Sequence, residues 1–201
     1  MSEAKFMAIC ISHQTDQVLV ERFKNGDQSA AEELITRYQD NVYTTIYYLV
    51  KDRYIADDLF QDTFLKMLAH LKRNNYVEQG KFLPWILRIA HNLCIDYFRK
   101  ARQMVRVVLP DGSDLMELLG GDSQCHEQTL VKSEVEQSVQ QMITLLPEEQ
   151  RTVVVLRTYG DLSFKEIAEM TGVSINTALG RMRYALKNMR RMIEEEKMIL
   201  R

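Results

Sequence analysis

Hydrophobic residues recur at intervals of three and four over three long stretches of the N-terminal half of the chain. The stretches are Leu34–Leu49, Ala56–Leu71 and Phe82–Tyr97. This spacing places apolar side chains on one face of an α-helix, and three such helices can enclose a common core. A short helix over Gln17–Lys24 is expected before them. The pattern predicts a helical bundle over residues 16–103, preceded by an N-terminal tail of residues 1–15.

The helical spacing fades over residues 104–133. This stretch contains Pro110, Gly112 and the pair Gly120 and Gly121, which are residues that interrupt regular structure. Seven acidic residues stand against one basic residue between positions 107 and 139. We therefore expect a flexible acidic linker at residues 104–133.

A second helical domain is expected over residues 134–193, followed by a C-terminal tail of residues 194–201. A helix that ends near Leu145 is followed by Pro147, a residue that favours the first turn of a further helix. The β-branched run Val153–Leu156 alone is typical of a strand, but the start and stop signals around it favour a helix. The predicted fold class is therefore all-α, with two small helical domains joined by a flexible acidic linker.

The second half of this domain predicts a helix, a tight turn and another helix. Ser163 can cap the first helix, and Gly172 can supply the turn. The second helix can begin at Ser174 or Asn176. The side chains expected to be buried are Ile167, Ala168, Ala178, Met182, Ala185 and Met189.

The outer face of this second helix is basic and rich in polar side chains. A helix of this kind fits the major groove of DNA, so we expect a DNA-reading helix-turn-helix at residues 163–189. A plain helical hairpin with a solvated outer face is the alternative. The expected DNA-contacting residues are Ser163, Lys165, Ser174, Asn176, Thr177, Gly180, Arg181, Arg183, Tyr184 and Lys187.

The formal net charge is only -2, so the overall composition does not indicate a nucleic-acid partner. The distribution of charge does indicate one. Residues 81–106 contain six basic residues and one acidic residue, and residues 140–193 contain eight basic and five acidic residues. Two basic blocks separated by an acidic one are typical of two binding modules on a tether.

Polar residues recur at spacings of four, four and three along one side of the third predicted helix. The arginines of this stripe can follow a nucleic-acid backbone, and Asn92 can form hydrogen bonds with a base. Asp96 can pair with Arg99 or with Lys100. The preceding loop, residues 74–81, is expected to receive an unstacked base. The expected DNA-binding residues here are Asn74, Tyr76, Gln79, Lys81, Arg88, Asn92, Asp96, Arg99, Lys100 and Arg102.

On the second long helix, acidic residues surround an otherwise exposed leucine, which is a plausible docking face for a partner protein. The face comprises Asp57, Asp58, Gln61, Asp62 and Leu65. One alternative is an acidic face that is simply solvated. Another is a carboxylate cluster that binds a metal for nuclease chemistry.

No metal, cofactor or catalytic residue is otherwise expected. Cys10, Cys94 and Cys125 are scattered without a C-x-x-C pair, so neither a disulfide framework nor a zinc site is indicated. His91 lies three residues before Cys94, but no second pair completes a metal site. The sequence has no apolar run long enough to span a membrane, and we expect a cytoplasmic protein.

Taken in order, these segments resemble the sigma factors of bacterial RNA polymerase, in particular the extracytoplasmic-function (ECF) type of the sigma-70 family. The resemblance covers about residues 16–193. It departs from the family at the start of the recognition helix, where Leu179 and Gly180 replace residues that are usually polar, and at Asp62, where Glu is usual. The matching blocks are Asp16–Arg22, Ala56–Phe64, Phe82–Lys100 and Leu146–Arg151, the last continuing into the helix-turn-helix.

The resemblance implies a non-enzymatic protein that binds core RNA polymerase, directs promoter-specific initiation and assists opening by capturing unstacked −10 bases. The acidic face would contact the clamp helices of the largest subunit, and the basic helix with its preceding loop would read the −10 element. The helix-turn-helix would read the −35 element and contact the flap region of the second-largest subunit. The linker would occupy the active-site and exit channel, a membrane-bound anti-sigma factor would be the inhibitor, and no small-molecule substrate is implied.

An autonomous helix-turn-helix regulator of transcription is the other interpretation of the same residues. It predicts tight and specific duplex binding by the free protein. It gives no role to the acidic face or to the linker.

Overall fold

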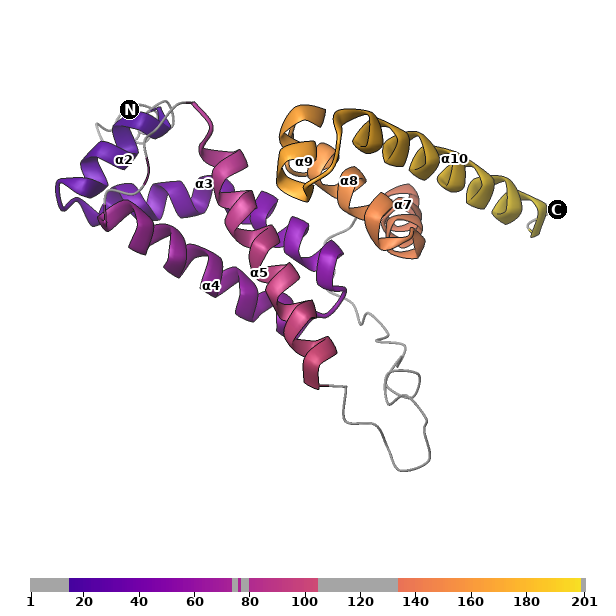
Figure 1. The fold of residues 1–201 in the computed structure, drawn as a ribbon, viewed down its shortest axis with the longest axis horizontal. Helices are drawn as coiled ribbons and strands as arrows, with labels where there is room; N and C mark the ends of the chain where they lie inside the picture. Colours follow the sequence, from indigo (N-terminus) through magenta and orange to yellow (C-terminus); the bar gives the residue numbers. More distant parts are fainter. Residues whose placement is uncertain (1–14, 74–75, 77–79, 105–133, 200–201) are drawn as a thin grey trace, which may run out of the picture.

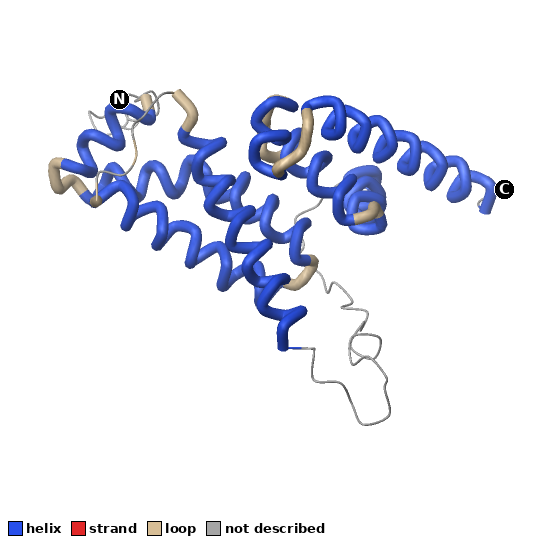
Figure 2. The backbone as a smooth tube through the Cα atoms, viewed as in Figure 1, coloured by secondary structure: helices blue, strands red, loops and turns tan. Residues whose placement is uncertain are grey.

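The computed structural model describes residues 15–73, 76, 80–104 and 134–199 of the chain. The N-terminal unit consists of α2 (Asp16–Lys24), α3 (Gln28–Val50), α4 (Arg53–Lys72) and α5 (Phe82–Met104). The C-terminal unit consists of α7 (Glu134–Leu145), α8 (Glu148–Thr158), α9 (Phe164–Thr171) and α10 (Ile175–Ile199). Figure 2 shows that helices make up nearly all of the described chain, so the prediction of an all-α fold with two helical units is confirmed.

Capping side chains set the helix boundaries of the N-terminal unit. The carboxylate of Asp27 accepts a hydrogen bond from the Ser29 amide at 3.0 Å and begins α3. Asp52 accepts one from the Ile55 amide at 3.1 Å and begins α4. Each bond satisfies an amide that the first turn of a helix leaves unpaired. Between the two helices, Lys51 adopts a left-handed conformation with φ 60°, which ends α3.

The apolar faces of α3, α4 and α5 meet in the core that the spacing of hydrophobic residues predicts. Leu34, Ile46, Met67 and Ile86 are all 0% exposed. Burial of a side chain of this size contributes roughly 1.5–3 kcal/mol. Because the apolar sides of α4 and α5 face inward, their polar sides point outward, and the two candidate surfaces of this unit lie on different helices.

The β-branched run Val153–Leu156 lies within α8 and is buried, so the helical interpretation is confirmed. Pro147 is the N-cap residue of this helix, and acidic residues occupy its first turn, where they interact favourably with the helix dipole. The last helix, α10, continues to Ile199, beyond the boundary at residue 193 that the sequence predicts. Residues 105–133, most of the predicted linker, lie outside the described residues.

The two units pack against each other, with α3 against α8 and α5 against α9. Figure 1 shows the C-terminal unit gathered at one side of the N-terminal helices, with α10 extending away from them. Ile86 and Leu87 of α5 belong to the same buried apolar cluster as Val153 and Leu156 of α8. The described residues of the two units therefore share one continuous core.

Candidate nucleic-acid and protein interfaces

An outward side of α4 carries the acidic cluster that the sequence predicts. Asp58, Gln61 and Asp62 are exposed. Leu65 lies beside them and is 64% exposed. Their spacings of three and four place them on one side of the helix. Tyr54, one turn earlier, is 85% exposed, and the sequence analysis missed it, although its position four residues before Asp58 could have indicated it.

Asp57, the remaining residue of the predicted face, has a different environment. It is only partly exposed and lies near Tyr43 of α3. Burial, and after it the neighbouring Asp57, raises the pKa of Tyr43. Asp57 therefore does not share the outward setting of Asp58. Within the described part of the chain, no group of three His, Cys, Asp or Glu residues is placed to hold a metal.

The polar side of α5 is exposed along most of its described length. Asn92, Arg99 and Lys100 are exposed. Asp96 pairs with Arg99, Oδ1 to Nη2 at 3.0 Å, which is one of the two partners that the sequence allowed. Arg88 is half-exposed and lies 3.8 Å from a carboxylate of α9. The predicted residues outside the described part are Asn74, Gln79 and the side chain of Arg102.

Tyr76 is buried, in contrast to the exposed position that the prediction of base stacking requires. It is 7% exposed, and its ring stacks on Trp85 with centroids 4.1 Å apart. Its carbonyl accepts a hydrogen bond from Lys24 Nζ at 3.0 Å. Stacked aromatic pairs of this kind contribute about 0.5–1.5 kcal/mol. In this conformation, the Tyr76 ring is packed against Trp85 and is not open to a base.

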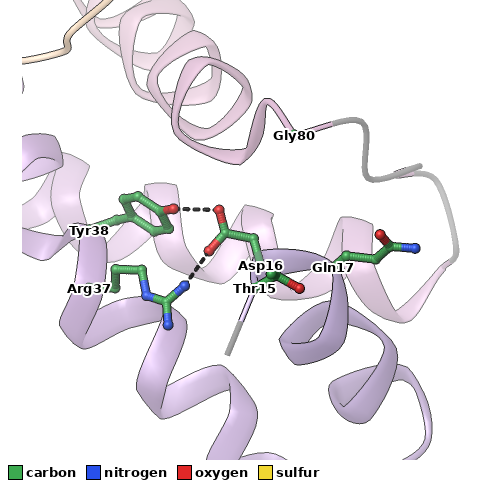
Figure 3. A pocket seen from close by; sticks show the side chains of 6 residues that line it. All are labelled: Thr15, Asp16, Gln17, Arg37, Tyr38 and Gly80. Atoms are coloured by element: carbon green, nitrogen blue, oxygen red, sulfur yellow. Dashed lines mark hydrogen bonds and ion pairs between the residues drawn. The ribbon is translucent and has the colours of Figure 1, made fainter. Parts of the chain in front are cut away.

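A cavity of about 460 Å³ lies beside the start of α5. Figure 3 shows Arg37 and Tyr38 of α3 pointing toward Asp16 of α2, with Gly80 across from them. Asp16 accepts hydrogen bonds from Arg37 Nη1 at 2.6 Å and from the Tyr38 hydroxyl at 2.5 Å. Burial, and after it the bond to Asp16, raises the pKa of Tyr38 well above its usual value. This network fixes α2 to α3 and was not predicted from the sequence.

The helix-turn-helix has the capping geometry that the sequence predicts. Ser163 Oγ accepts a hydrogen bond from the Glu166 amide at 3.3 Å, and the Glu166 carboxylate accepts one from the Ser163 amide at 3.0 Å. This reciprocal pair begins α9 and lowers the pKa of Glu166. Gly172 ends α9 with φ 68°, a conformation that favours glycine. Ser174 Oγ accepts from the Thr177 amide at 3.1 Å, so Ser174 is the residue that caps α10.

The outer face of the helix-turn-helix is largely open to solvent. Two predicted residues differ from the rest. Arg181 is bound to Glu149 of α8 at 2.8 Å, and its side chain is only 21% exposed. Gly180 is half-buried, yet a Cβ added there would meet nothing within 4 Å. The exposed predicted residues are Ser163, Lys165, Ser174, Asn176, Thr177, Arg183, Tyr184 and Lys187.

The inner face of the same unit matches its predicted core. Ala178 and Ala185 of α10 are 0% exposed, and Ile167 of α9 is also fully buried. Met182 and Met189 are partly buried against this core. Small residues on the inner side let α10 lie close to α8 and α9, which fixes the direction of its polar face. None of the described helices is long and apolar enough to cross a membrane.

Comparison with known families assigns both units. Family models of sigma-70 region 2 and sigma-70 region 4 match residues 34–104 and 136–189. The RNA polymerase sigma-H factor of Pseudomonas aeruginosa is 31% identical over 180 residues, which cover 85% of this chain and 90% of that protein. The ECF sigma factor SigW of Bacillus subtilis is 28% identical over 180 residues, covering 88% and 95%.

These matches define the chain as a sigma factor of RNA polymerase. It belongs to the sigma-70 family and to its ECF group. As a sigma factor, it binds core RNA polymerase and promoter DNA, directs promoter-specific initiation of transcription, and is not an enzyme.

Solved structures share the fold. The sigma factor RpoE of Bartonella quintana, solved in complex with the anti-sigma factor NepR, gives a TM-score of 0.68 at 19% identity, covering 81% of this chain and 96% of that chain. CnrH, solved in complex with the cytosolic domain of CnrY, gives 0.59 at 20% identity, covering 90% and 99%. At these sequence identities, both similarities show a shared arrangement of helices.

Proposed function

We propose that this sigma factor assists promoter opening by capturing unstacked bases of the −10 element on α5. Asn92 is exposed between Arg88 and Arg99 on one side of this helix, and this placement is the observation that carries the proposal. The arginines can hold the backbone of the separated strand while the Asn92 amide forms hydrogen bonds with a base edge. Each captured and stacked base contributes roughly 1–3 kcal/mol, which offsets part of the cost of separating the duplex.

The polymerase-facing surface is the outward side of α4. Asp58 and Asp62 flank Leu65, and Tyr54 extends the surface by one turn. Exposed aromatic and aliphatic side chains among polar residues are typical of the centre of a protein interface. The proposed partner of this surface is the pair of clamp helices of the largest polymerase subunit.

The helix-turn-helix is proposed to read the −35 element with the polar face of α10 and to contact the flap region of the second-largest subunit. Thr177, Arg183 and Lys187 are exposed along that face, which supports insertion into a major groove. A membrane-bound anti-sigma factor is the proposed inhibitor. Support for an anti-sigma factor comes from the structural neighbour RpoE of Bartonella quintana, which was solved in complex with the anti-sigma factor NepR.

Run-off transcription on a promoter library, with core polymerase in the presence and absence of this protein, tests the function. We expect selective initiation only with the protein, and permanganate-reactive thymines in the −10 region of the selected promoters. Asn92→Ala should reduce this reactivity while leaving binding to core polymerase unchanged. Asn25→Ala, at the exposed end of α2, is the matched control. Normal opening by the Asn92 variant would refute base capture on α5, and tight duplex binding without polymerase would favour an autonomous regulator.

The α4 surface has its own test. Asp62→Lys should lower the affinity for core polymerase about tenfold or more, because it reverses a charge within the proposed contact. Asp40→Lys, on an exposed acid of α3, is the control for the change in net charge. Fluorescence anisotropy gives both affinities, and circular dichroism checks that both variants fold. Equal affinities would remove polymerase binding from α4.

A further inference from the structure

Leu179 is a large apolar side chain on the outside of the proposed DNA-reading helix. It lies in α10 and is 44% exposed. Neither apolar cluster of the described residues includes it, and Ala178 and Met182 supply the inward contacts of this part of the helix. Ile175, one turn earlier, is 46% exposed, and the spacing of four residues places it on the same side as Leu179. Packing within the unit therefore does not account for this apolar strip of Ile175 and Leu179.

The apolar strip borders the polar face of α10. Asn176 lies three residues before Leu179, and Arg183 lies four residues after it, so both exposed side chains are neighbours of Leu179 on the helix surface. The first acidic residue of α10 is Glu194, whereas Arg183 and Lys187 are both exposed. A helix with cations and no carboxylate over these turns attracts a polyanion. The surroundings of the strip therefore favour DNA over an apolar protein surface as its occupant.

Leu179 also lies in the part of α10 that can come closest to the bases. The cap at Ser174 begins the helix, and Leu179 follows within its first two turns. In a helix-turn-helix, the N-terminal residues of the recognition helix contact the base edges. The next residue is Gly180, where an added Cβ would meet nothing within 4 Å. With no side chain at Gly180, a base edge can approach Leu179 closely.

The major groove offers a leucine one favourable partner. The base edges there carry hydrogen-bond donors and acceptors, and the C5 methyl group of thymine is the apolar exception. Against a donor or an acceptor, a leucine would displace water without replacing its hydrogen bonds, which is unfavourable. Against the methyl group, both partners bury apolar surface, which is favourable. A leucine at this position therefore selects a base by its methyl group and not by its hydrogen-bonding pattern.

We propose that Leu179, extended by Ile175, is a specificity-determining residue that selects a thymine in the −35 element by apolar contact with the C5 methyl group. The inference rests on the proposed reading of the −35 element by α10. Asn176 and Arg183 contact polar groups of the neighbouring base pairs and phosphates, and the apolar strip adds one base that they do not read. Loss of that single methyl group weakens promoter binding even when base pairing is unchanged.

Replacement of thymine by uracil tests the contact, because uracil lacks only the methyl group and pairs with adenine in the same way. Each thymine of the −35 element, on either strand of a promoter selected by run-off transcription, is replaced singly. The affinity of the holoenzyme for each promoter is measured by competition. At one position or at two adjacent positions, uracil should weaken binding by about fourfold, the effect expected from burying one methyl group.

The variant Leu179→Ala assigns the effect to its side chain. It removes the apolar group and keeps a residue that favours the helix, so the protein should fold normally. The variant should bind the thymine and uracil promoters equally, which gives a coupling between side chain and methyl group in a double-mutant cycle. Leu186→Ala is the matched control, because Leu186 lies two turns further along α10 and is 43% exposed. The control should retain the preference for thymine of about fourfold.

Three results would overturn the thymine contact. In the first, no uracil replacement weakens binding of the wild type, or the −35 element contains no A·T pair. In the second, Leu179→Ala retains the full preference for thymine, which would assign the methyl group to another residue. In the third, Leu179→Ala weakens binding to core polymerase in the absence of DNA and discriminates uracil as the wild type does, which would assign the strip to a protein contact.

Footprinting of the same complexes separates this inference from the proposed function. Normal protection of the −35 element together with equal affinities for thymine and uracil would remove only the role of Leu179. A wild-type holoenzyme that leaves the −35 element unprotected, and whose binding no base-pair replacement in that element changes, would refute −35 reading by α10 and the thymine contact with it.

Discussion

His91 is a buried titratable residue of α5 that the proposed DNA surface does not use. It is 6% exposed, and its Nδ1 has no hydrogen-bond partner among the described residues. Burial lowers its pKa from the ordinary value of 6.5. The folded protein therefore keeps this imidazole neutral at a pH at which the unfolded chain binds a proton.

The free energy of unfolding should consequently fall as the pH drops through 6.5, because only the unfolded state then gains the proton of His91. His91→Leu should lose this part of the pH dependence. His70→Leu, which replaces an exposed histidine of α4, should retain it. Melting temperatures at about pH 7.5 and about pH 5.5 provide the comparison. An equal drop in the wild type and in His91→Leu would contradict the prediction.

Single residues also show where sequence reasoning reaches its limit. Ser163 and Gly172 were predicted correctly because a cap and a left-handed turn depend on neighbours a few residues away. Arg181 and Tyr76 have the side-chain types that DNA contact requires, but they pack against Glu149 and Trp85. Such partners come from other helices, and spacing within one helix does not identify them.

At the scale of elements, hydrophobic spacing and capping residues predicted α3, α4, α5, α8 and the helix-turn-helix. The sequence analysis placed the domain boundary at residue 193, whereas the helix α10 continues to Ile199. Neither Gly nor Pro follows Ile193, so nothing stops the backbone hydrogen bonding of the helix before Ile199.

Gly180 is the position of α10 at which we expect helix stability and the proposed DNA reading to oppose each other. A glycine within a helix costs about 0.5–1 kcal/mol relative to alanine. Since a Cβ at Gly180 would meet nothing within 4 Å, no packing of the described chain requires a glycine there. We expect Gly180→Ala to raise the free energy of unfolding by up to that amount and to weaken binding of the −35 element, because the added methyl group keeps the DNA backbone or a base at a greater distance.

Chemical denaturation and footprinting of the holoenzyme on promoter DNA measure the two effects. Gly160→Ala is the contrasting variant, because its Cβ would lie 2.6 Å from the Leu156 carbonyl oxygen and should destabilise the protein. A Gly180→Ala protein that is more stable and protects the −35 element normally would show that DNA does not approach this part of α10 closely.

At the scale of the whole molecule, the sequence predicted two units but not the contact between them. Tyr48 and Leu87 lie in stretches of helical spacing and look like ordinary bundle core in the sequence. The period of a stripe shows which side of a helix is buried, but not which partner buries it. The contact became evident only from the packing of α3 against α8 and of α5 against α9.

The shared core predicts how the free protein unfolds. Because Ile86 and Leu87 belong to the same buried cluster as Val153 and Leu156, we expect both units to melt in a single transition. Calorimetry should give a ratio of calorimetric to van't Hoff enthalpy of about one. Asn41 Nδ2 of α3 donates a hydrogen bond to the Tyr159 carbonyl at 2.6 Å, so Asn41→Asp, which places a carboxylate against that carbonyl, should lower this cooperativity and separate the transitions. Two resolved transitions in the wild type would show that the units are energetically independent.

Tyr54 and Leu65 remain uncovered on α4 while Arg88 is held by α9. With the roles proposed for α4 and α5, a newly made molecule in this arrangement would bind core polymerase more readily than promoter DNA. Free sigma factor would not be bound up by the large excess of nonspecific chromosomal sites. Its concentration would fall only as fast as core polymerase without a bound sigma factor becomes available. The number of active promoters would then follow the supply of that enzyme more closely than the concentration of the factor itself.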